Sequence, residues 1–325
     1  MTALLERTIR DLPSLDADAM RLAEARQIRL TKPPGALGRL ESLSVQLAGI
    51  QGTAEPRIRH KAIAVMAGDH GVTAEGVSAF PAEVTPGMVF NLAAGGAAVN
   101  VIGRHVGARV IVTDVGVNAD VGAASGVRQK KIRMGTANMV LGPAMSREEC
   151  VRAIEVGIES VEEELAAGLD VIATGEMGIG NTTAASAVIA ALTGRPAAKV
   201  TGRGTGIAEE ALPAKVAVIE RALAINTPDV GDPIDVLSKV GGLEIAAMTG
   251  VFLGGAAHRI PVVMDGFISA AAALAAVRLC HKCADYILAS HVSVEIGHQV
   301  VLDELGLVPF FDLQMRLGEG TGAAL

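Results

Sequence analysis

LDVIATGEMGIGNTT, residues 169–183, contains an apolar run, a glycine-rich turn and the first residues of an alanine-rich helix, and it decides the expected fold. The run Leu169–Ala173 does not alternate with polar residues, which predicts a strand buried on both faces, as in a parallel sheet. The segment Thr182–Leu192 predicts the helix that follows the turn. A strand, a tight turn and a helix in this order are typical of α/β proteins.

The same order recurs along the middle of the chain. Four more buried strands are predicted over Lys61–Ala67, Ala108–Val115, Ile260–Met264 and Ala284–Ala289. Helices are predicted over Leu243–Leu253 and Ser269–Leu279. The pattern therefore predicts the α/β class, with a doubly wound, Rossmann-like parallel sheet. Ligands of such sheets bind beyond the carboxyl ends of the strands, where the turns after all five strands are expected to lie.

Both ends of the chain differ from this middle part and are expected to be mainly helical. Helices are predicted over Asp16–Arg29, Gly38–Gly49 and Ile296–Leu305, with a turn at Lys32–Gly35 and an irregular tail after the last helix. We expect the two ends to meet in a small helical domain. Its predicted extent is residues 1–55 plus 292–325, and the large α/β nucleotide-binding domain spans residues 56–291.

Composition excludes several classes of protein. The 325 residues are 50% hydrophobic and carry a formal net charge of −7, which disfavours both disorder and nucleic-acid binding. Residues 1–10 lack the apolar core of a signal peptide. The uncharged stretch 177–194 is long enough to span a membrane, but its Gly, Asn, Thr and Ser residues argue against that role. We expect no nucleic-acid or membrane partner.

The three cysteines are an odd and sparse set, which is typical of a reducing, cytoplasmic location. Cys280 and Cys283 form a lone CxxC motif, and a zinc site would need a second pair of ligands at metal spacing. We expect both thiols to be structural, and the sequence predicts no metal ion and no cofactor.

The turn Gly175–Thr183 is the strongest candidate binding site, because a helix N-terminus after a glycine loop attracts anions. Asn181 or Thr182 is expected to cap that helix. The turn is not a dinucleotide fingerprint, since Thr183 stands at its third glycine position, and no GK[ST] follows as in a P-loop. A phosphate or carboxylate site is the functional interpretation, and a plain tight turn is the alternative.

Three weaker candidates accompany this turn. The flexible loop Gly202–Gly206 and Lys215 could close over a phosphate, although solvated side chains are the ordinary alternative. Asp69 and His70, at the end of a predicted strand, could be acid–base groups or could tie down the loop by hydrogen bonds. The following segment, Glu75–Gly96, is predicted to be a mobile loop that covers substrate. Glu319, between two glycines, is a candidate general base or the tip of a loop.

These motifs resemble the nicotinate-nucleotide–dimethylbenzimidazole phosphoribosyltransferase family. The matching segments run in the family's order from residue 32 to residue 325, and GEMGIGNTT and RLGEGTGAAL are the most specific of them. The segments are KPPGALGRLE (32–41), AGDHGV (67–72), EVTPGMVFN (83–91), GEMGIGNTT (175–183), GRGTG (202–206), GGLEIAAMTG (241–250), DGFISAAAALAA (265–276), ASHVSVEIG (289–297) and RLGEGTGAAL (316–325).

The resemblance implies transfer of 5-phosphoribosyl from nicotinate mononucleotide to 5,6-dimethylbenzimidazole, which gives α-ribazole 5′-phosphate and nicotinate. It implies a homodimer in which the neighbour's small domain contributes to each site. The implied catalytic residues are Glu319, as general base, and Glu176. The implied phosphate- and nucleotide-binding residues are Gly178, Ile179, Gly180, Asn181, Thr182, Gly202, Arg203, Gly204, Lys215 and Ser293, and Phe80, Met88 and Leu317 are expected to contact the base.

The sequence departs from the family in two places. Gly87, preceded by Pro86, stands where the family usually has a Gln that contacts the base. Family members continue beyond the position of Leu325 into a terminal helix, so the sequence is expected to end short of the family's length. An apolar slot without that amide discriminates a missing methyl group by only about 1–3 kcal/mol, so we expect related azoles and purines to be accepted.

One carboxylate, acting as a general base, is sufficient for the implied reaction. The pyridinium of nicotinate mononucleotide is already a cationic leaving group, and only the N–H proton of the azole nucleophile has to be removed, which is worth about 10²- to 10⁴-fold. Inversion at C1′ turns the β-nucleotide into an α-riboside. A dehydrogenase would need a dinucleotide fingerprint, which fails at Thr183. The remaining alternative is a non-catalytic module that binds a nucleotide or azole and would not need Glu319.

Overall fold

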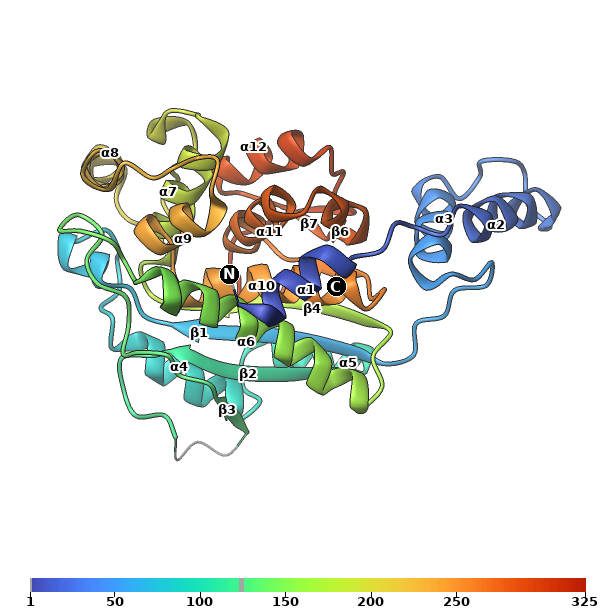
Figure 1. The fold of residues 1–325 in the computed structure, drawn as a ribbon, viewed down its shortest axis with the longest axis horizontal. Coiled ribbons are helices and arrows are strands. Elements are labelled where there is room, and N and C mark those ends of the chain that lie inside the picture. Colours follow the sequence, from blue (N-terminus) through green and yellow to red (C-terminus); the bar gives the residue numbers. More distant parts are fainter. Residues whose placement is uncertain (1, 123–125) are drawn as a thin grey trace.

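The computed structural model describes residues 2–122 and 126–325 and contains a parallel sheet covered by helices (Figure 1). The six strands run in the order β3-β2-β1-β4-β5-β6. Their bounds are Lys61–Gly68 (β1), Ala108–Gly116 (β2), Val127–Gln129 (β3), Val171–Met177 (β4), Val262–Met264 (β5) and Ile287–Ala289 (β6). This order is that of a doubly wound sheet, and it confirms the predicted fold class.

The strand order reverses between β1 and β4, which are central neighbours. Ala67 of β1 pairs with Met177 of β4, so the two strands finish side by side at one edge of the sheet. The crevice beyond this point is where sheets of this topology bind ligands.

The helices fall into two layers and a projecting pair. Their bounds are Ala3–Asp11 (α1), Ala17–Arg29 (α2), Arg39–Gln51 (α3), Val84–Ala93 (α4), Ala98–Val106 (α5), Arg147–Ala166 (α6), Asn181–Thr193 (α7), Leu212–Asn226 (α8), Pro233–Val240 (α9), Leu243–Ala257 (α10), Phe267–Leu279 (α11) and Ile296–Leu305 (α12). All six predicted helices are present, with ends that differ from the prediction by four residues or fewer. Each of the five predicted strands has a counterpart in the sheet, but three begin later than predicted: β4 starts at Val171, β5 starts at Val262, and residues 284–286 end a 3-10 helix (His281–Tyr286) before β6 starts.

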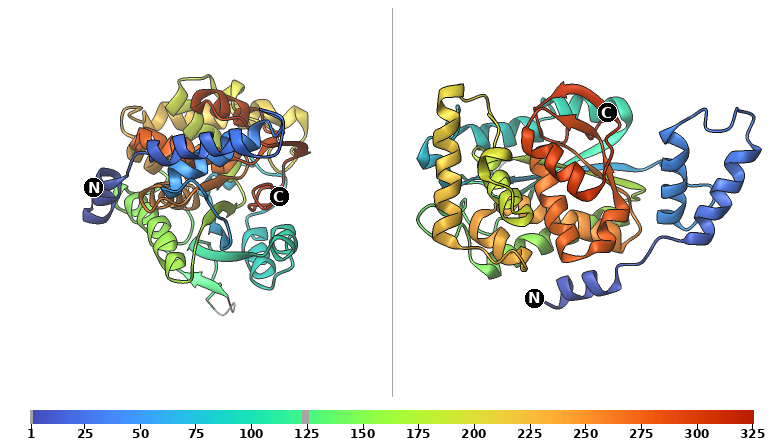
Figure 2. Two further views of the ribbon diagram at one scale, coloured as in Figure 1. Left: turned by 90° about the vertical axis from the view of Figure 1, so that its right-hand side faces the viewer. Right: turned by 90° about the horizontal axis from the view of Figure 1, so that it is seen from above.

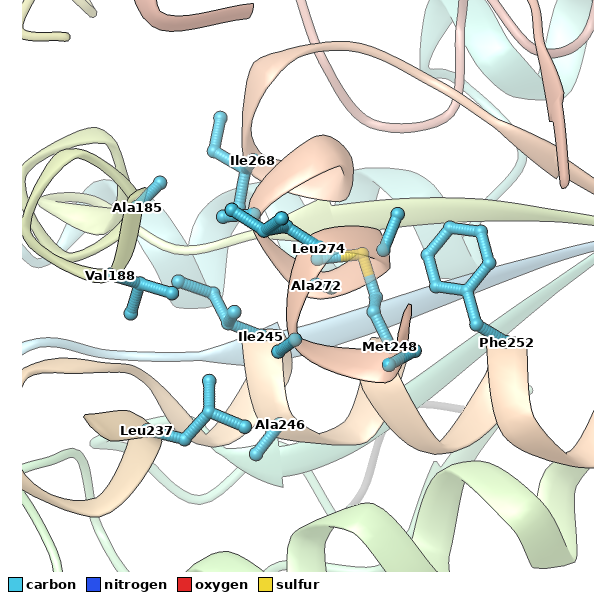
Figure 3. Close-up of a cluster of buried hydrophobic side chains, with 14 of the residues drawn as sticks. Ala185, Val188, Leu237, Ile245, Ala246, Met248, Phe252, Ile268, Ala272 and Leu274 are labelled. Atoms are coloured by element: carbon cyan, nitrogen blue, oxygen red, sulfur yellow. The ribbon is translucent and has the colours of Figure 1, made fainter. Parts of the chain in front are cut away.

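Alternate residues of β1 face two different cores. Ala62, Ala64 and Met66 pack with α6, α7 and α9–α11, whereas Ile63 and Val65 pack with α4 and α5. Figure 3 shows the first core, in which side chains from α7, α9, α10 and α11 meet. Burial on both faces explains why the strand sequences do not alternate.

Three other predicted boundaries were wrong. The fourth strand does not end at Ala173, because β1 runs on beside it, and Gly175 and Glu176 therefore pair within the sheet. Part of the predicted loop Glu75–Gly96 is helix α4, because Pro86 lies in the first helical turn, where its missing N–H is not needed. The predicted irregular tail contains strand β8 (Phe311–Met315), which pairs with β7 (His291–Ser293).

Helices α2 and α3 project from one end of the molecule (Figure 2). Helix α3 contacts the C-terminal segment, since Arg39 donates a hydrogen bond to the Pro309 carbonyl at 2.6 Å and stacks on the Phe310 ring at 4.4 Å. Helix α12 packs on α11 and α7, two of the helices that cover the sheet. A separate small domain stays a prediction, and Met1, which it included, lies outside the described residues.

One stretch of the described residues, Val84–Val106, is long and apolar enough to cross a membrane by length and composition. It comprises α4 and α5, and the break between them contains Gly95 and Gly96. Both helices cover a face of the sheet, and core helices of water-soluble proteins pass the same test.

The two thiols of the CxxC motif lie at the end of α11. Cys283 is fully buried, and burial raises its pKa. A buried thiol with a raised pKa is unreactive, which fits the structural role predicted for it. Within residues 2–122 and 126–325, no cluster of three or more His, Cys, Asp or Glu side chains could hold a metal ion.

The crossing of α6 and α10 generates a stability prediction. A Cβ on Gly157 would lie 2.7 Å from the Val251 backbone nitrogen, and a Cβ on Gly250 would lie 3.0 Å from the Gly157 Cα. We expect Gly157→Ala to lower the free energy of unfolding by roughly 3 kcal/mol or more, measured by urea denaturation, because rigid backbone blocks the added methyl. Gly87→Ala is the control: its Cβ meets no atom within 4 Å, so we expect it to be neutral or stabilising by up to about 1 kcal/mol. Equal stability of the two variants would contradict the close crossing.

Candidate active site

A pocket of ≈ 450 Å³ opens beyond the carboxyl ends of β1 and β4. It is lined by the loop after β4, the start of α4, the segment 265–269 and the C-terminal tail. Of the predicted site residues, those that line it are Glu176, Gly178, Ile179, Asn181, Thr182, Gly204, Ser293, Phe80, Met88, Leu317 and Glu319. Gly180, Gly202, Arg203 and Lys215 are not among the lining residues.

The β4–α7 loop is held by backbone contacts. Gly178 lies directly against the Gly68 carbonyl of β1, so a side chain there would collide with rigid backbone. The Ile179 N–H donates to Thr85 Oγ1 at 3.0 Å. Gly180, with φ of +95°, begins α7 as its N-cap.

The predicted cap on α7 was wrong. No side chain caps this helix, and Asn181 is its first residue and donates its Nδ2 proton to Glu176 Oε2 instead. Of the first three N–H groups of α7, those of Asn181 and Thr183 donate to the Gly178 and Gly180 carbonyls at 3.1 Å and 3.0 Å. The N–H of Thr182 is the one left for a ligand at this helix N-terminus.

Lys215 of α8 lies behind the α7 N-terminus and is only 2% exposed. Its Nζ donates to Thr182 Oγ1 at 2.9 Å and to the Gly202 carbonyl at 3.3 Å. Burial lowers its pKa to about 8, although the charge of Glu295 opposes that shift. Lys215 forms no ion pair with any described carboxylate, so its charge is not neutralised by this part of the chain, and a direct contact between Lys215 and a ligand stays a prediction.

The second glycine loop lies beside Lys215. The Gly204 N–H donates to Glu295 Oε1 at 2.8 Å, whereas Arg203 turns its Nε–H to the Ile207 carbonyl at 2.7 Å. Gly204 lines the pocket, but Arg203 does not, so a direct contact between Arg203 and a ligand stays a prediction.

Glu176 ends its strand inside the pocket and is 5% exposed. Its carboxyl group accepts from Asn181 and from the Glu319 backbone N–H at 3.3 Å. Burial raises the pKa of Glu176 to about 8, and the neighbouring carboxylates of Asp265, Glu244 and Glu319 add to the shift, which the Glu319 N–H opposes. At neutral pH this group is mostly protonated.

Glu319 lies in the tail, opposite Glu176, with a backbone φ of +63°. A non-glycine residue in this region costs roughly 1–3 kcal/mol, and such strain gathers at functional sites. Burial raises the pKa of the Glu319 carboxyl, and the charge of Asp265 adds to the effect. The tail can cross the end of β4 because Gly175 has no side chain: a Cβ there would lie 2.6 Å from the Glu319 carbonyl oxygen.

Sequence reasoning missed Asp265, His291, Glu295 and Arg316, which also line the pocket. For Asp265 and His291 a signal existed, since Asp265 directly follows the predicted strand that ends at Met264, and His291 lies two residues after the one that ends at Ala289. Glu295 and Arg316 follow β7 and β8, the pair of short strands that the sequence did not indicate.

Asp69 and His70 fix their loop by hydrogen bonds, which is the alternative to the acid–base role that the sequence also allowed. His70 Nε2 lies 2.7 Å from Glu244 Oε1 in a fully buried pair. Asp69 Oδ2 accepts from the Asn118 N–H at 2.8 Å. Neither residue lines the pocket, and both have their hydrogen-bond partners within the protein.

The pocket combines three kinds of surface. Phe80, Met88 and Leu317 supply apolar surface, Glu176 and Glu319 supply carboxyl groups, and the α7 N-terminus beside Gly204 is the candidate anion site. A ligand with a flat ring at one end and a phosphate at the other matches this arrangement.

This chain is similar to known proteins in its sequence and in its fold. Residues 12–325 match the family model described as "Phosphoribosyltransferase". The nicotinate-nucleotide–dimethylbenzimidazole phosphoribosyltransferase of Chloroflexus aggregans is 57% identical over 99% of this chain and 92% of its own, and that of Geobacter sulfurreducens is 54% identical over 100% and 92%. The solved structure of the Thermus thermophilus enzyme of the same name matches with a TM-score of 0.91 and 45% identity, over 96% of this chain and 92% of that one.

The raised pKa of Glu176 predicts a pH-dependent stability. The carboxyl titrates near 4.5 when unfolded and near 8 when folded, so the unfolded state loses its proton first and the free energy of unfolding falls as pH rises between these values. A shift of one pKa unit corresponds to about 1.4 kcal/mol in the free energy of unfolding. We expect Glu176→Gln to remove this contribution to the pH dependence. Urea denaturation at pH 5 and pH 8 measures it, with the exposed Glu220→Gln as control. An unchanged slope in Glu176→Gln would contradict the assignment.

Proposed function

The chain belongs to the nicotinate-nucleotide–dimethylbenzimidazole phosphoribosyltransferase family, and on that premise we propose its reaction in detail. The enzyme transfers 5-phosphoribosyl from nicotinate mononucleotide to 5,6-dimethylbenzimidazole or a related azole or purine base. The products are α-ribazole 5′-phosphate and nicotinate, and the configuration at C1′ is inverted.

Glu319 is the general base in this proposal. The observation that carries it is that the Glu319 carboxyl faces the pocket and accepts no hydrogen bond from any residue in the described ranges, so its lone pairs are free for the N–H of the base. Glu176 is less suitable, because its oxygens already accept two hydrogen bonds and its pKa of about 8 keeps it protonated at neutral pH. A non-catalytic binding module would not need a carboxyl group at this position with its lone pairs free.

The phosphate of the nucleotide binds at the other end of the pocket. The N–H of Thr182 at the start of α7 and the buried ammonium of Lys215 would pair with it, and Thr182 Oγ1 accepts a hydrogen bond from that ammonium. Ser293, which also lines the pocket, is the proposed neighbour of the ribose. Binding the phosphate this tightly at one end fixes C1′ in front of the base, an effect that can supply about 7–11 kcal/mol of the barrier.

The two reacting rings lie on opposite faces of the ribose, because inversion requires in-line attack. Nicotinate leaves as a neutral pyridine ring from its cationic form and needs no general acid. The attacking azole nitrogen becomes positively charged as its bond to C1′ forms, and Glu319 takes the N–H proton from the ring. Glu176, protonated and close to the Glu319 backbone, keeps a second negative charge away from the base.

The base is selected mainly by apolar fit. No atom lies within 4 Å of a Cβ on Gly87, so the region above this part of α4 is open. Met88 and Val84 of the same helix, together with Leu317, bound the apolar side of the pocket. Such contacts discriminate one methyl group by about 1–3 kcal/mol, which supports acceptance of several azoles.

We also propose a homodimer in a cytoplasmic setting. The projecting helices and their connection expose large apolar side chains, which a second subunit would cover. These are Leu22, Ile28, Leu30, Leu37 and Leu40, which are 40–82% exposed. The three cysteines are free thiols, which supports a reducing compartment.

The role of Glu319 is tested by Glu319→Gln. We expect kcat to fall by about 10²-fold or more with little change in the KM for nicotinate mononucleotide, because the amide keeps the shape but accepts no proton. The wild-type kcat should rise with pH through the raised pKa of Glu319, since only the ionised carboxylate is a base. Single-turnover release of nicotinate measures both effects.

An N-alkylated imidazole is the control nucleophile, because its product stays cationic without loss of a proton. We expect the deficit of Glu319→Gln to shrink with it. An equal deficit on both nucleophiles, together with a larger deficit in Glu176→Gln on dimethylbenzimidazole, would assign the proton transfer to Glu176.

Lys215→Met tests the phosphate end. We expect the KM for nicotinate mononucleotide to rise at least about tenfold, because a buried charge-assisted contact is lost, while the KM for the base changes little. Lys199→Met removes an exposed ammonium from a neighbouring segment and should leave both KM values unchanged. Similar behaviour of the two variants would exclude Lys215 as a phosphate ligand.

A further inference from the structure

Asp265 is a buried carboxylate that the reaction described above does not use. It lies in the turn between β5 and α11, is 2% exposed and lines the pocket. Its own backbone N–H donates to Ser269 Oγ at 3.3 Å, which fixes the turn. Its two carboxylate oxygens point to the C-terminal tail: Oδ1 accepts from the Ala323 N–H at 2.9 Å and Oδ2 from the Gly320 N–H at 3.1 Å.

The tail needs such an anchor, because it contains no helix or strand between Met315 and Leu325. Three successive residues, Gly318, Glu319 and Gly320, have φ values of +81°, +63° and +83°. This left-handed run costs free energy at Glu319 and is not held by a regular hydrogen-bond ladder. Within the tail, only the Thr321 N–H to Gly318 and the Ala324 N–H to Gly320 bonds, at 3.0 Å, cross the run.

Two carboxyl groups, those of Glu176 and Asp265, hold the bend of the tail at Glu319 and Gly320. Glu176 accepts the Glu319 N–H, and Asp265 accepts the next N–H and the N–H of Ala323. The two carboxyl groups belong to neighbouring strands of the sheet, β4 and the end of β5, so the tail is fastened to the rigid scaffold. A base held on such an element keeps its geometry better than one on a free loop.

We propose that Asp265 is a positioning residue for catalysis: by accepting two backbone N–H groups of the tail, it holds Glu319 in its left-handed conformation with the carboxyl facing the base. The inference rests on the proposed role of Glu319 as general base. Asp265 itself is not assigned any proton transfer.

Asp265 also acts on Glu319 through its charge. Burial raises the pKa of Asp265, which the charge of His291 and the hydrogen bonds from Ala323 and Gly320 oppose. Where Asp265 is ionised, its charge raises the pKa of Glu319. The other titratable groups that line the pocket with this pair are Glu176 of β4, His291 of β7, Glu295 after β7 and Arg316 of the tail. Glu244 of α10 acts on Glu176.

Asp265→Asn separates positioning from general stability. The amide oxygen can accept one tail N–H, but the amide nitrogen faces the other and cannot accept it. We expect kcat to fall by about 10²-fold or more, with the KM for nicotinate mononucleotide near that of the wild type, because the phosphate end is on other elements. The acidic limb of the kcat profile should move to lower pH, since the charge that raises the pKa of Glu319 has been removed.

Amide hydrogen exchange of the free enzyme gives a second readout. In Asp265→Asn we expect the N–H groups of Gly320 and Ala323 to exchange at least about tenfold faster, while those of β1 and β4 are unaffected. The control is Asp114→Asn, another buried carboxylate at the end of a strand, which accepts the Val117 N–H at 2.9 Å. We expect it to lower stability without moving the pH profile or the exchange of the tail.

Combination with Glu319→Gln completes the test. Two residues that act as one unit give non-additive losses, so Asp265→Asn should lower kcat little further in the Glu319→Gln background. If Glu319→Gln lowers kcat as expected, but the two losses multiply and the pH profile of Asp265→Asn is that of the wild type, the positioning role is overturned and the proposed base stands. If Glu319→Gln is fully active, both are overturned.

Discussion

The site depends on one steric constraint, which is that three pieces of backbone come together where β1 and β4 end. Gly178 lies against the Gly68 carbonyl, and Gly175 lies against the backbone of Glu319. A side chain at either position would collide with this backbone and push the β4 loop or the tail outward. With the backbone this close, Glu176 at the strand end and Glu319 on the tail face the same pocket. Helix α7, whose N-terminus is the proposed anion site, begins at Asn181, four residues after β4 ends at Met177.

The close packing also creates an electrostatic problem. Glu176, Asp265 and Glu319 are all buried, and none of them forms an ion pair with a Lys or Arg of the described chain. Backbone N–H groups supply part of the missing stabilisation, and a raised pKa supplies the rest by letting a carboxyl group remain neutral. Such a site lowers the stability of the fold. It also makes one carboxylate more basic than it would be in water, which suits removal of a proton from an azole.

Much of this architecture could be predicted from the sequence, because burial on both faces leaves a strong signal in β1, β2 and β4. The anion loop was also predictable, since Gly178 and Gly180 follow a strand and precede a helix. The extent of β4 was not, because a strand's end is set by its neighbour: β1 continues and pairs with Gly175 and Glu176. Helix α4 was hidden by Pro86 and Gly87, whose low propensities are outweighed by burial of Val89 and Leu92 against the sheet.

The position of the tail was the least predictable part of the site. Residues 316–325 have no periodicity, and their conformation is determined by acceptors far away in sequence, Glu176 and Asp265. Local patterns cannot reveal such contacts, so the residues of GEGTG alone are equally compatible with the tip of a loop. The same dependence has a functional consequence. In the proposed reaction, nucleotide binding uses α7 and α8, whereas the proposed general base lies on the tail. Binding energy at the phosphate end would then hold C1′ in place while the tail is adjusted independently for proton transfer.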